Sequence, residues 1–162
     1  MQAKSKTIFR WLLIALILMT FAFIFFQSIL PRETSAKESD TVSNIVAEII
    51  SPETKPGAFL QDNIRKVAHF SEFALLGAEI ALYVLLFMKR GSIIYLSLIF
   101  AFIFGLIDET IQIYSGRGAA FFDTLIDASG YILAAAFLYT GATLISCIRN
   151  KVNKNSQNTT VE

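Results

Sequence analysis

The sequence predicts an all-α, polytopic membrane protein: a four-transmembrane-helix bundle with a short amphipathic helix in the first outer loop. Of the 162 residues, 54% are hydrophobic and only 17% are charged, whereas roughly 25% are charged in a typical soluble domain. The apolar residues gather in four runs long enough to cross a bilayer. An ordinary soluble enzyme is therefore disfavoured. The net charge of +1 provides no basic stripe for nucleic acid, which we exclude as a partner.

The first predicted span covers residues 11–30, which carry no charge and follow three basic residues. Because signal peptides have apolar stretches of only about 7 to 15 residues, we expect an uncleaved anchor. The small residues at 34–36 leave cleavage as the alternative. The further spans are predicted at residues 67–88, 92–114 and 124–148, within one transmembrane domain over residues 1–150. The polar residues 151–162 are expected to form a disordered cytoplasmic tail, since they have too little apolar surface to pack.

The loop after the first span carries a helical pattern. Apolar residues recur at the spacing of one helical face, at Val42, Ile45, Val46 and Ile49. We expect a short helix there, capped by Asp40 or Thr41 and lying on the membrane surface or on the bundle. A helix restarting near Ala58 leads into the second span.

The distribution of lysine and arginine predicts a multi-pass protein of the cell membrane with both termini in the cytoplasm. In this orientation eight of these residues lie on the inner side and six on the outer side. The inner segments at Lys89 and after residue 148 carry basic residues and no acid before Glu162.

Ionisable side chains inside the spans are the strongest functional signal, because each costs at least about 2.5 to 3.5 kcal/mol at the bilayer centre. Since successive spans alternate in direction, most of these side chains are predicted at the outer end of the bundle. Glu79 is the exception, about 15 Å deeper than His69. The residues predicted at the outer end are Arg65, Lys66, His69, Glu72, Asp108, Glu109, Gln112, Arg117, Asp123 and Asp127.

Three ordered motifs occur along the chain: residues 65–73 (RKVAHFSEF), residues 108–112 (DETIQ), and Arg117 followed by Asp123-x3-Asp127-x2-Gly130. Together they resemble the VanZ-like family of small bacterial membrane proteins, over roughly residues 8–148. The founding member of that family is associated with resistance to the lipoglycopeptide teicoplanin. The family usually has asparagine at the position of Asp127. An ionised carboxylate only accepts hydrogen bonds, whereas an amide also donates them.

The resemblance implies a protein that lowers susceptibility to teicoplanin-type antibiotics by binding or shielding an amphipathic ligand at the outer leaflet. The expected partners are membrane lipid and a lipid-linked envelope precursor or the lipoglycopeptide. The phosphate or carboxylate groups of the amphipathic ligand would be held by Arg65, Lys66 and Arg117. A membrane enzyme that modifies a lipid-linked envelope molecule or the antibiotic is the alternative, and a structural or transport-related role involving Glu79 also stays open. The catalytic candidates are His69, Glu72, Asp108 and Glu109.

No loop with metal-ligand spacing occurs in the sequence, so we predict neither a metal nor a cofactor. His69 is the single histidine, and its acidic neighbours would suit calcium, magnesium or manganese better than zinc. A salt-bridge network that helps the helices pack is the simpler interpretation of these charges. Cys147 is predicted at the cytoplasmic end, far from His69, which argues against thiol chemistry.

Overall fold

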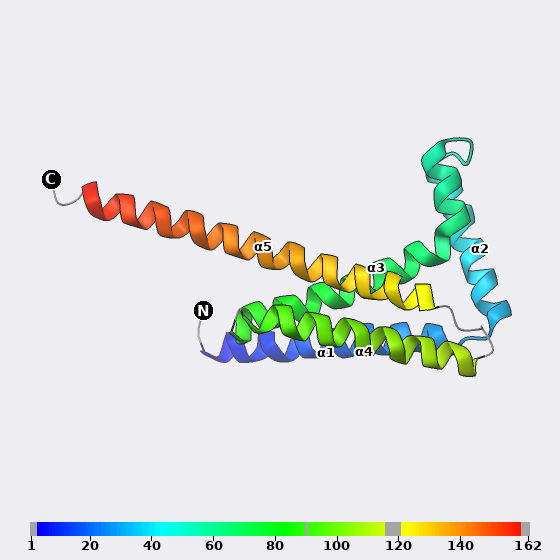
Figure 1. Ribbon diagram of the computed structural model, residues 1–162, viewed down its shortest axis with the longest axis horizontal. Helices are drawn as coiled ribbons and strands as arrows, with labels where there is room; N and C mark the ends of the chain where they lie inside the picture. Colours follow the sequence, from blue (N-terminus) through cyan, green and yellow to red (C-terminus); the bar gives the residue numbers. More distant parts are fainter. Residues whose placement is uncertain (1–2, 90, 116–120, 160–162) are drawn as a thin grey trace.

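The computed structural model describes residues 3–89, 91–115 and 121–159, and the regular structure within these ranges is helical. Four of its five helices contain a segment long and apolar enough to cross a membrane: α1, α3, α4 and α5. The predicted four-helix membrane bundle is confirmed. The helices, shown in Figure 1, are α1 (Ala3–Ile29), α2 (Arg32–Ile49), α3 (Lys55–Phe87), α4 (Ser92–Tyr114) and α5 (Phe121–Thr159).

Helix α3 is the central element, because it packs against each of the other four helices. Figure 1 shows α1, α4 and the second half of α3 side by side, with α5 crossing them and extending well beyond the bundle. Helix α2 and the first turns of α3 project from one end. At this end α1 and α4 finish and α5 begins. We call it the polar end.

A bend in α3 separates its projecting turns from its membrane segment. The helix begins at Lys55, three residues before the predicted restart, and the Thr54 side chain caps it by accepting a hydrogen bond of 3.2 Å from the Gly57 amide. At Asn63 the backbone leaves helical geometry, with φ −123° and ψ 16°. The Asn63 side-chain amide donates to the Phe59 carbonyl at 3.0 Å. The bend places the following residues, from Ile64 onward, at the mouth of the bundle.

The predicted helix of the first loop is present, but the prediction that Asp40 or Thr41 caps its start is wrong. Helix α2 begins at Arg32 with Pro31 at the N-cap, and the Thr41 hydroxyl donates to the Lys37 carbonyl at 2.9 Å, as in a helix interior. Glu33 in the first turn favours this early start, since it complements the helix dipole. The apolar face stays exposed, with Ile49 78% accessible, as expected of a helix on a membrane surface.

The polar residues 151–159 are helical, contrary to the disorder expected for the tail. They continue α5, and extending an existing helix costs far less than nucleating a new one. No proline or glycine interrupts the sequence after Gly141. The last three residues, 160–162, lie outside the described ranges. Helix α4, by contrast, has the predicted bounds.

Glycines allow α3 and α5 to pack with their backbones nearly in contact. A Cβ atom on Gly130 would collide with the Phe70 carbonyl of α3, and one on Gly77 would collide with the backbone of Tyr131. Such small residues strengthen van der Waals packing between membrane helices. The core beside these contacts consists of Ile24, Phe73, Leu76, Ala101, Ala128 and Tyr131.

Candidate functional site

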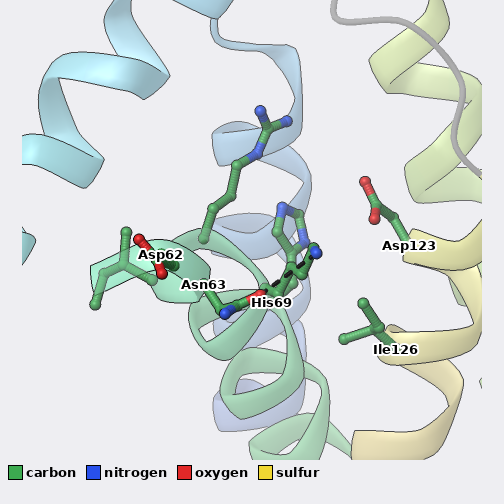
Figure 2. Close-up of a pocket in the computed structure, with 8 residues that line it drawn as sticks. Asp62, Asn63, His69, Asp123 and Ile126 are labelled. Carbon is green, nitrogen blue, oxygen red and sulfur yellow. Dashed lines mark hydrogen bonds between the residues drawn. The ribbon is translucent and has the colours of Figure 1, made fainter. Parts of the chain in front are cut away.

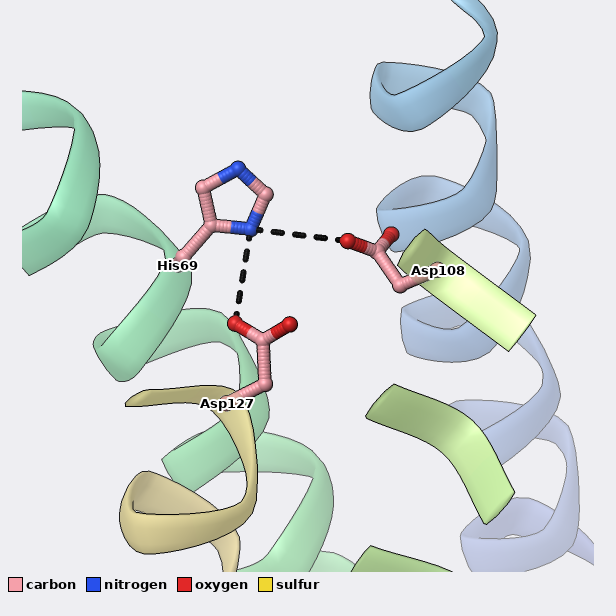
Figure 3. Close-up of side chains that lie close together, drawn as sticks. All are labelled: His69, Asp108 and Asp127. Atoms are coloured by element: carbon pink, nitrogen blue, oxygen red, sulfur yellow. Dashed lines mark ion pairs between the residues drawn. The ribbon is translucent and has the colours of Figure 1, made fainter. Parts of the chain in front are cut away.

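Three ionisable side chains from three helices converge at the polar end. The Nδ1 atom of His69 on α3 lies 3.9 Å from Asp108 Oδ2 on α4 and 3.6 Å from Asp127 Oδ1 on α5. Figure 3 shows the imidazole directed at both carboxylates. The carboxylates are almost fully buried, with side-chain exposures of 0% and 1%, whereas the histidine side chain is 14% exposed. We call these three residues the His-Asp cluster.

Hydrogen bonds from two helices hold Asp108 in the cluster. Gln112 lies one turn further along α4, on the same face as predicted, and its amide donates to Asp108 Oδ2. The hydroxyl of Ser28, near the end of α1, donates to Asp108 Oδ1. Ser115, which follows the last residue of α4, also links the ends of α1 and α4, because its hydroxyl donates a hydrogen bond of 3.1 Å to the Ser28 carbonyl. Both carboxylate oxygens of Asp108 therefore act as acceptors, and the side chain has a defined direction.

Asp127 reaches the cluster because α5 lies so close to α3. Gly130, less than one turn further along α5, is packed against the Phe70 carbonyl, next to His69 in the sequence. Within the described part of the chain, Asp127 Oδ1 has no hydrogen-bond partner. This oxygen lies 3.6 Å from His69 Nδ1.

A cavity of about 260 Å³ opens beside His69, between α3 and the start of α5. Figure 2 shows Asp62, Asn63 and His69 on one side and Asp123 and Ile126 on the other. Arg65 and Lys66 add positive charge to its lining. The remaining lining residue is Ile64.

The two basic side chains of this cavity share its lining with Asp62 and Asp123. Lys66 Nζ donates to Asn63 Oδ1 at 3.4 Å. Among the residues that the structure describes, neither Arg65 nor Lys66 forms an ion pair with a carboxylate; the ion pairs found there join His69 to the two aspartates. An anionic group in the cavity would lie beside both cations.

A second cavity, of about 240 Å³, lies between α1, α2 and α3. Arg65 and His69 line this cavity as well as the first, so the histidine borders both cavities and the buried carboxylates. Glu72 lines the second cavity but not the first. Its other lining residues are Phe23, Gln27, Ser35, Glu38, Ser39, Val42, Ile64 and Ala68.

The remaining predicted residues differ in their relation to the cluster. Asp123 lines the first cavity. Glu109 is half-buried and lies outside the three-residue cluster, because neighbouring residues on a helix point about 100° apart. Arg117 falls outside the described residues. Glu79 is buried deeper in the bundle, where its carboxylate accepts a hydrogen bond of 2.9 Å from Thr20 on α1.

Sequence reasoning missed Ser28 and Asn63. Ser28 is a small polar residue within an uncharged span, and such residues are common in membrane helices without a site. The signal that could have identified Ser28 is its depth in the membrane. It lies two residues before the end of the first predicted span, near the same end of the bundle as Asp108 in the third. Asn63 precedes the second predicted span, and no pattern in the sequence marks it as the bend.

Four membrane helices with a histidine and two buried carboxylates clustered at one end define a polytopic α-helical membrane protein with a polar intramembrane site. A family model described as VanZ/LLP1 matches residues 11–145. The chain therefore belongs to the VanZ/LLP1 family, as the motifs indicate. No curated protein and no solved structure matches the chain.

Proposed function

We propose that this VanZ-like protein lowers susceptibility to teicoplanin-type lipoglycopeptide antibiotics by binding or shielding an amphipathic envelope ligand at the outer leaflet. The supporting observation is the cavity beside His69, where Arg65 and Lys66 have no carboxylate partner among the described residues. The antibiotic association derives from the family. The ligand class derives from the chemistry of this cavity.

The lining of the cavity suits a head group that carries both signs of charge. Arg65 and Lys66 would bind phosphate or carboxylate oxygens through charge-assisted hydrogen bonds. Asp123 and, in the second cavity, Glu72 would accept hydrogen bonds from amine or hydroxyl groups. Gln112 would orient Asp108 through its hydrogen bond, and Asp127 would orient the His69 imidazole.

The size of the cavity favours a lipid-linked molecule as the ligand. Its volume of about 260 Å³ is below the roughly 300 to 1,000 Å³ of sites that enclose a drug-sized ligand. A head group fits such a volume, whereas a complete lipoglycopeptide does not. The acyl chains of the ligand would remain in the bilayer around the apolar surface of the bundle.

The proposal is tested by expressing the protein in a susceptible host and measuring teicoplanin susceptibility. Arg65→Ala, Lys66→Ala and the double variant His69→Ala/Asp108→Ala are expected to lose most of the protection, because they remove the cations and the cluster. Glu48→Gln is the matched control: it removes an exposed charge on α2 outside both cavities and should protect like the wild type. Equal protection by all variants at equal membrane levels would contradict the proposed site.

A membrane enzyme acting on the same ligand is the second candidate, and the orientation of His69 favours it. Because Nδ1 faces the two carboxylates, Nε2 is the ring nitrogen that would exchange a proton with a ligand bound in a neighbouring cavity. Carboxylates placed in this way orient an imidazole and stabilise its protonated form. Mass spectrometry of envelope lipids and antibiotic from the same strains separates the candidates. A modified molecule that depends on His69 indicates catalysis, whereas unchanged molecules with retained protection indicate binding.

A further inference from the structure

We propose that the His-Asp cluster binds a divalent transition-metal cation such as Mn²⁺ or Zn²⁺, through His69 Nδ1, Asp108 Oδ2 and Asp127 Oδ1. This inference concerns the occupant of the cluster and is independent of which ligand enters the neighbouring cavities. The spacing of the sequence predicts no metal, because each donor lies on a different helix and only the packing of the bundle brings the three together.

The separations within the cluster suit ligands around a shared ion. The Nδ1 to oxygen distances of 3.6 and 3.9 Å are longer than the roughly 2.7 to 3.2 Å of a direct N–H···O hydrogen bond. One donor atom from each residue lies within 4.8 Å of the other two. Donor atoms at these separations can surround one cation, since zinc ligand distances of roughly 2.0 to 2.2 Å place two ligands of the same ion about 3 to 4 Å apart.

The charge of the cluster also favours a dication. Two buried carboxylates face the His69 imidazole, and a dication between them would offset their negative charge. Asp127 Oδ1 is fully enclosed, points at the centre of the cluster and has no hydrogen-bond partner in the described part of the chain. Burying an acceptor in this state is unfavourable, and coordination to a cation would satisfy it. One imidazole nitrogen with two carboxylate oxygens combines the donor preferences of zinc and manganese.

The surroundings of the cluster resemble those of known types of metal site. Gln112 and Ser28 hydrogen-bond to the carboxylate of Asp108 and orient it, which is the usual role of groups around the ligands of a metal. His69 lines both cavities and is the member of the cluster nearest to open space, with a side chain that is 14% exposed.

Titration of the purified full-length protein in lipid nanodiscs with Mn²⁺ tests the proposal, with free Mn²⁺ measured by electron paramagnetic resonance. The wild type should bind one Mn²⁺ per chain, and Zn²⁺ should displace it. Asp108→Asn and Asp127→Asn should each weaken binding at least about tenfold, and Gln112→Ala should weaken it about 10- to 100-fold by releasing Asp108. Glu79→Gln is the matched control, since it neutralises a buried acid outside the cluster, and should bind like the wild type.

Circular dichroism and size-exclusion profiles of each variant establish that it is folded. If Asp108→Asn does not fold, the nearly isosteric Asp127→Asn decides the question. Absence of saturable binding of either ion to the wild type would overturn the proposal, and so would unchanged affinity in folded Asp127→Asn. Either result leaves the antibiotic proposal standing, because that proposal is tested through Arg65 and Lys66 in cells.

Discussion

At the scale of single residues, two buried carboxyl groups accept hydrogen bonds from hydroxyl groups on a neighbouring helix. Ser28 of α1 bonds to Asp108 of α4, and Thr20 of α1 bonds to Glu79 of α3. In a membrane interior no water is present to replace a lost partner, so such pairs fix the rotation of one helix against the next. Glu79 therefore has a structural explanation that requires no proton transfer.

The pair formed by Thr20 and Glu79 separates a structural role from a transport role. Glu79→Gln should retain both the stability and the antibiotic protection, because the amide oxygen still accepts from the Thr20 hydroxyl. Thr20→Val should lower the free energy of unfolding by about 0.6 kcal/mol and by no more than about 1.7 kcal/mol, the average and the maximum measured for hydrogen bonds between membrane helices. Thermal unfolding in detergent measures the stability. Loss of protection in folded, stable Glu79→Gln would instead require a titrating carboxyl and favour transport.

At the scale of elements, the bend in α3 and the close contact of α3 with α5 position the site. The bend at Asn63 turns the projecting first turns away from the bundle and leaves Arg65 and His69 at its mouth. The glycine contacts bring Asp127 of α5 within 3.6 Å of His69. A wider spacing of these two helices would separate the members of the cluster.

Substitution of Gly130 tests the close contact between α3 and α5. Gly130→Ala should destabilise the protein by about 1 to 3 kcal/mol or more, because the added methyl group meets backbone rather than an adaptable side chain. Gly141→Ala is the matched control on the same helix: nothing lies within 4 Å of its added Cβ, and alanine favours helix, so stability should hold or rise slightly. Unfolding in detergent measures both. Equal stability of the two variants would contradict the close packing described.

At the scale of the whole molecule, the function depends on which side of the membrane the polar end faces. Both cavities lie at the polar end of the bundle, where residues of α1, α2, α3 and α5 line them. The excess of basic residues at the opposite end, including Lys4, Lys6 and Lys89, favours an outward-facing polar end. Access to an outer-leaflet ligand requires this orientation.

Reporter fusions test the orientation. A reporter fused after Lys89 should lie in the cytoplasm, because the basic residues of this loop retain it inside. Green fluorescent protein fused there should fluoresce, and alkaline phosphatase fused there should be inactive. A fusion at Glu53, in the turn between α2 and α3, should give the opposite pair of signals. An external reporter at Lys89 would place the polar end in the cytoplasm, and the proposal of an outer-leaflet ligand would then fail.

The sequence by itself determined the four spans and the common end at which the ionisable residues gather, since hydropathy and the alternation of helix direction are properties of the linear chain. It also paired Asp108 with Gln112, because residues four apart share a helical face. The sequence placed ten residues at that end without ranking them. Only the tertiary structure selected His69, Asp108 and Asp127 as a cluster, added Ser28, and set Glu109 apart. Those choices depend on the rotation and spacing of the helices, which the bend at Asn63 and the contact at Gly130 control over distances that no local pattern encodes.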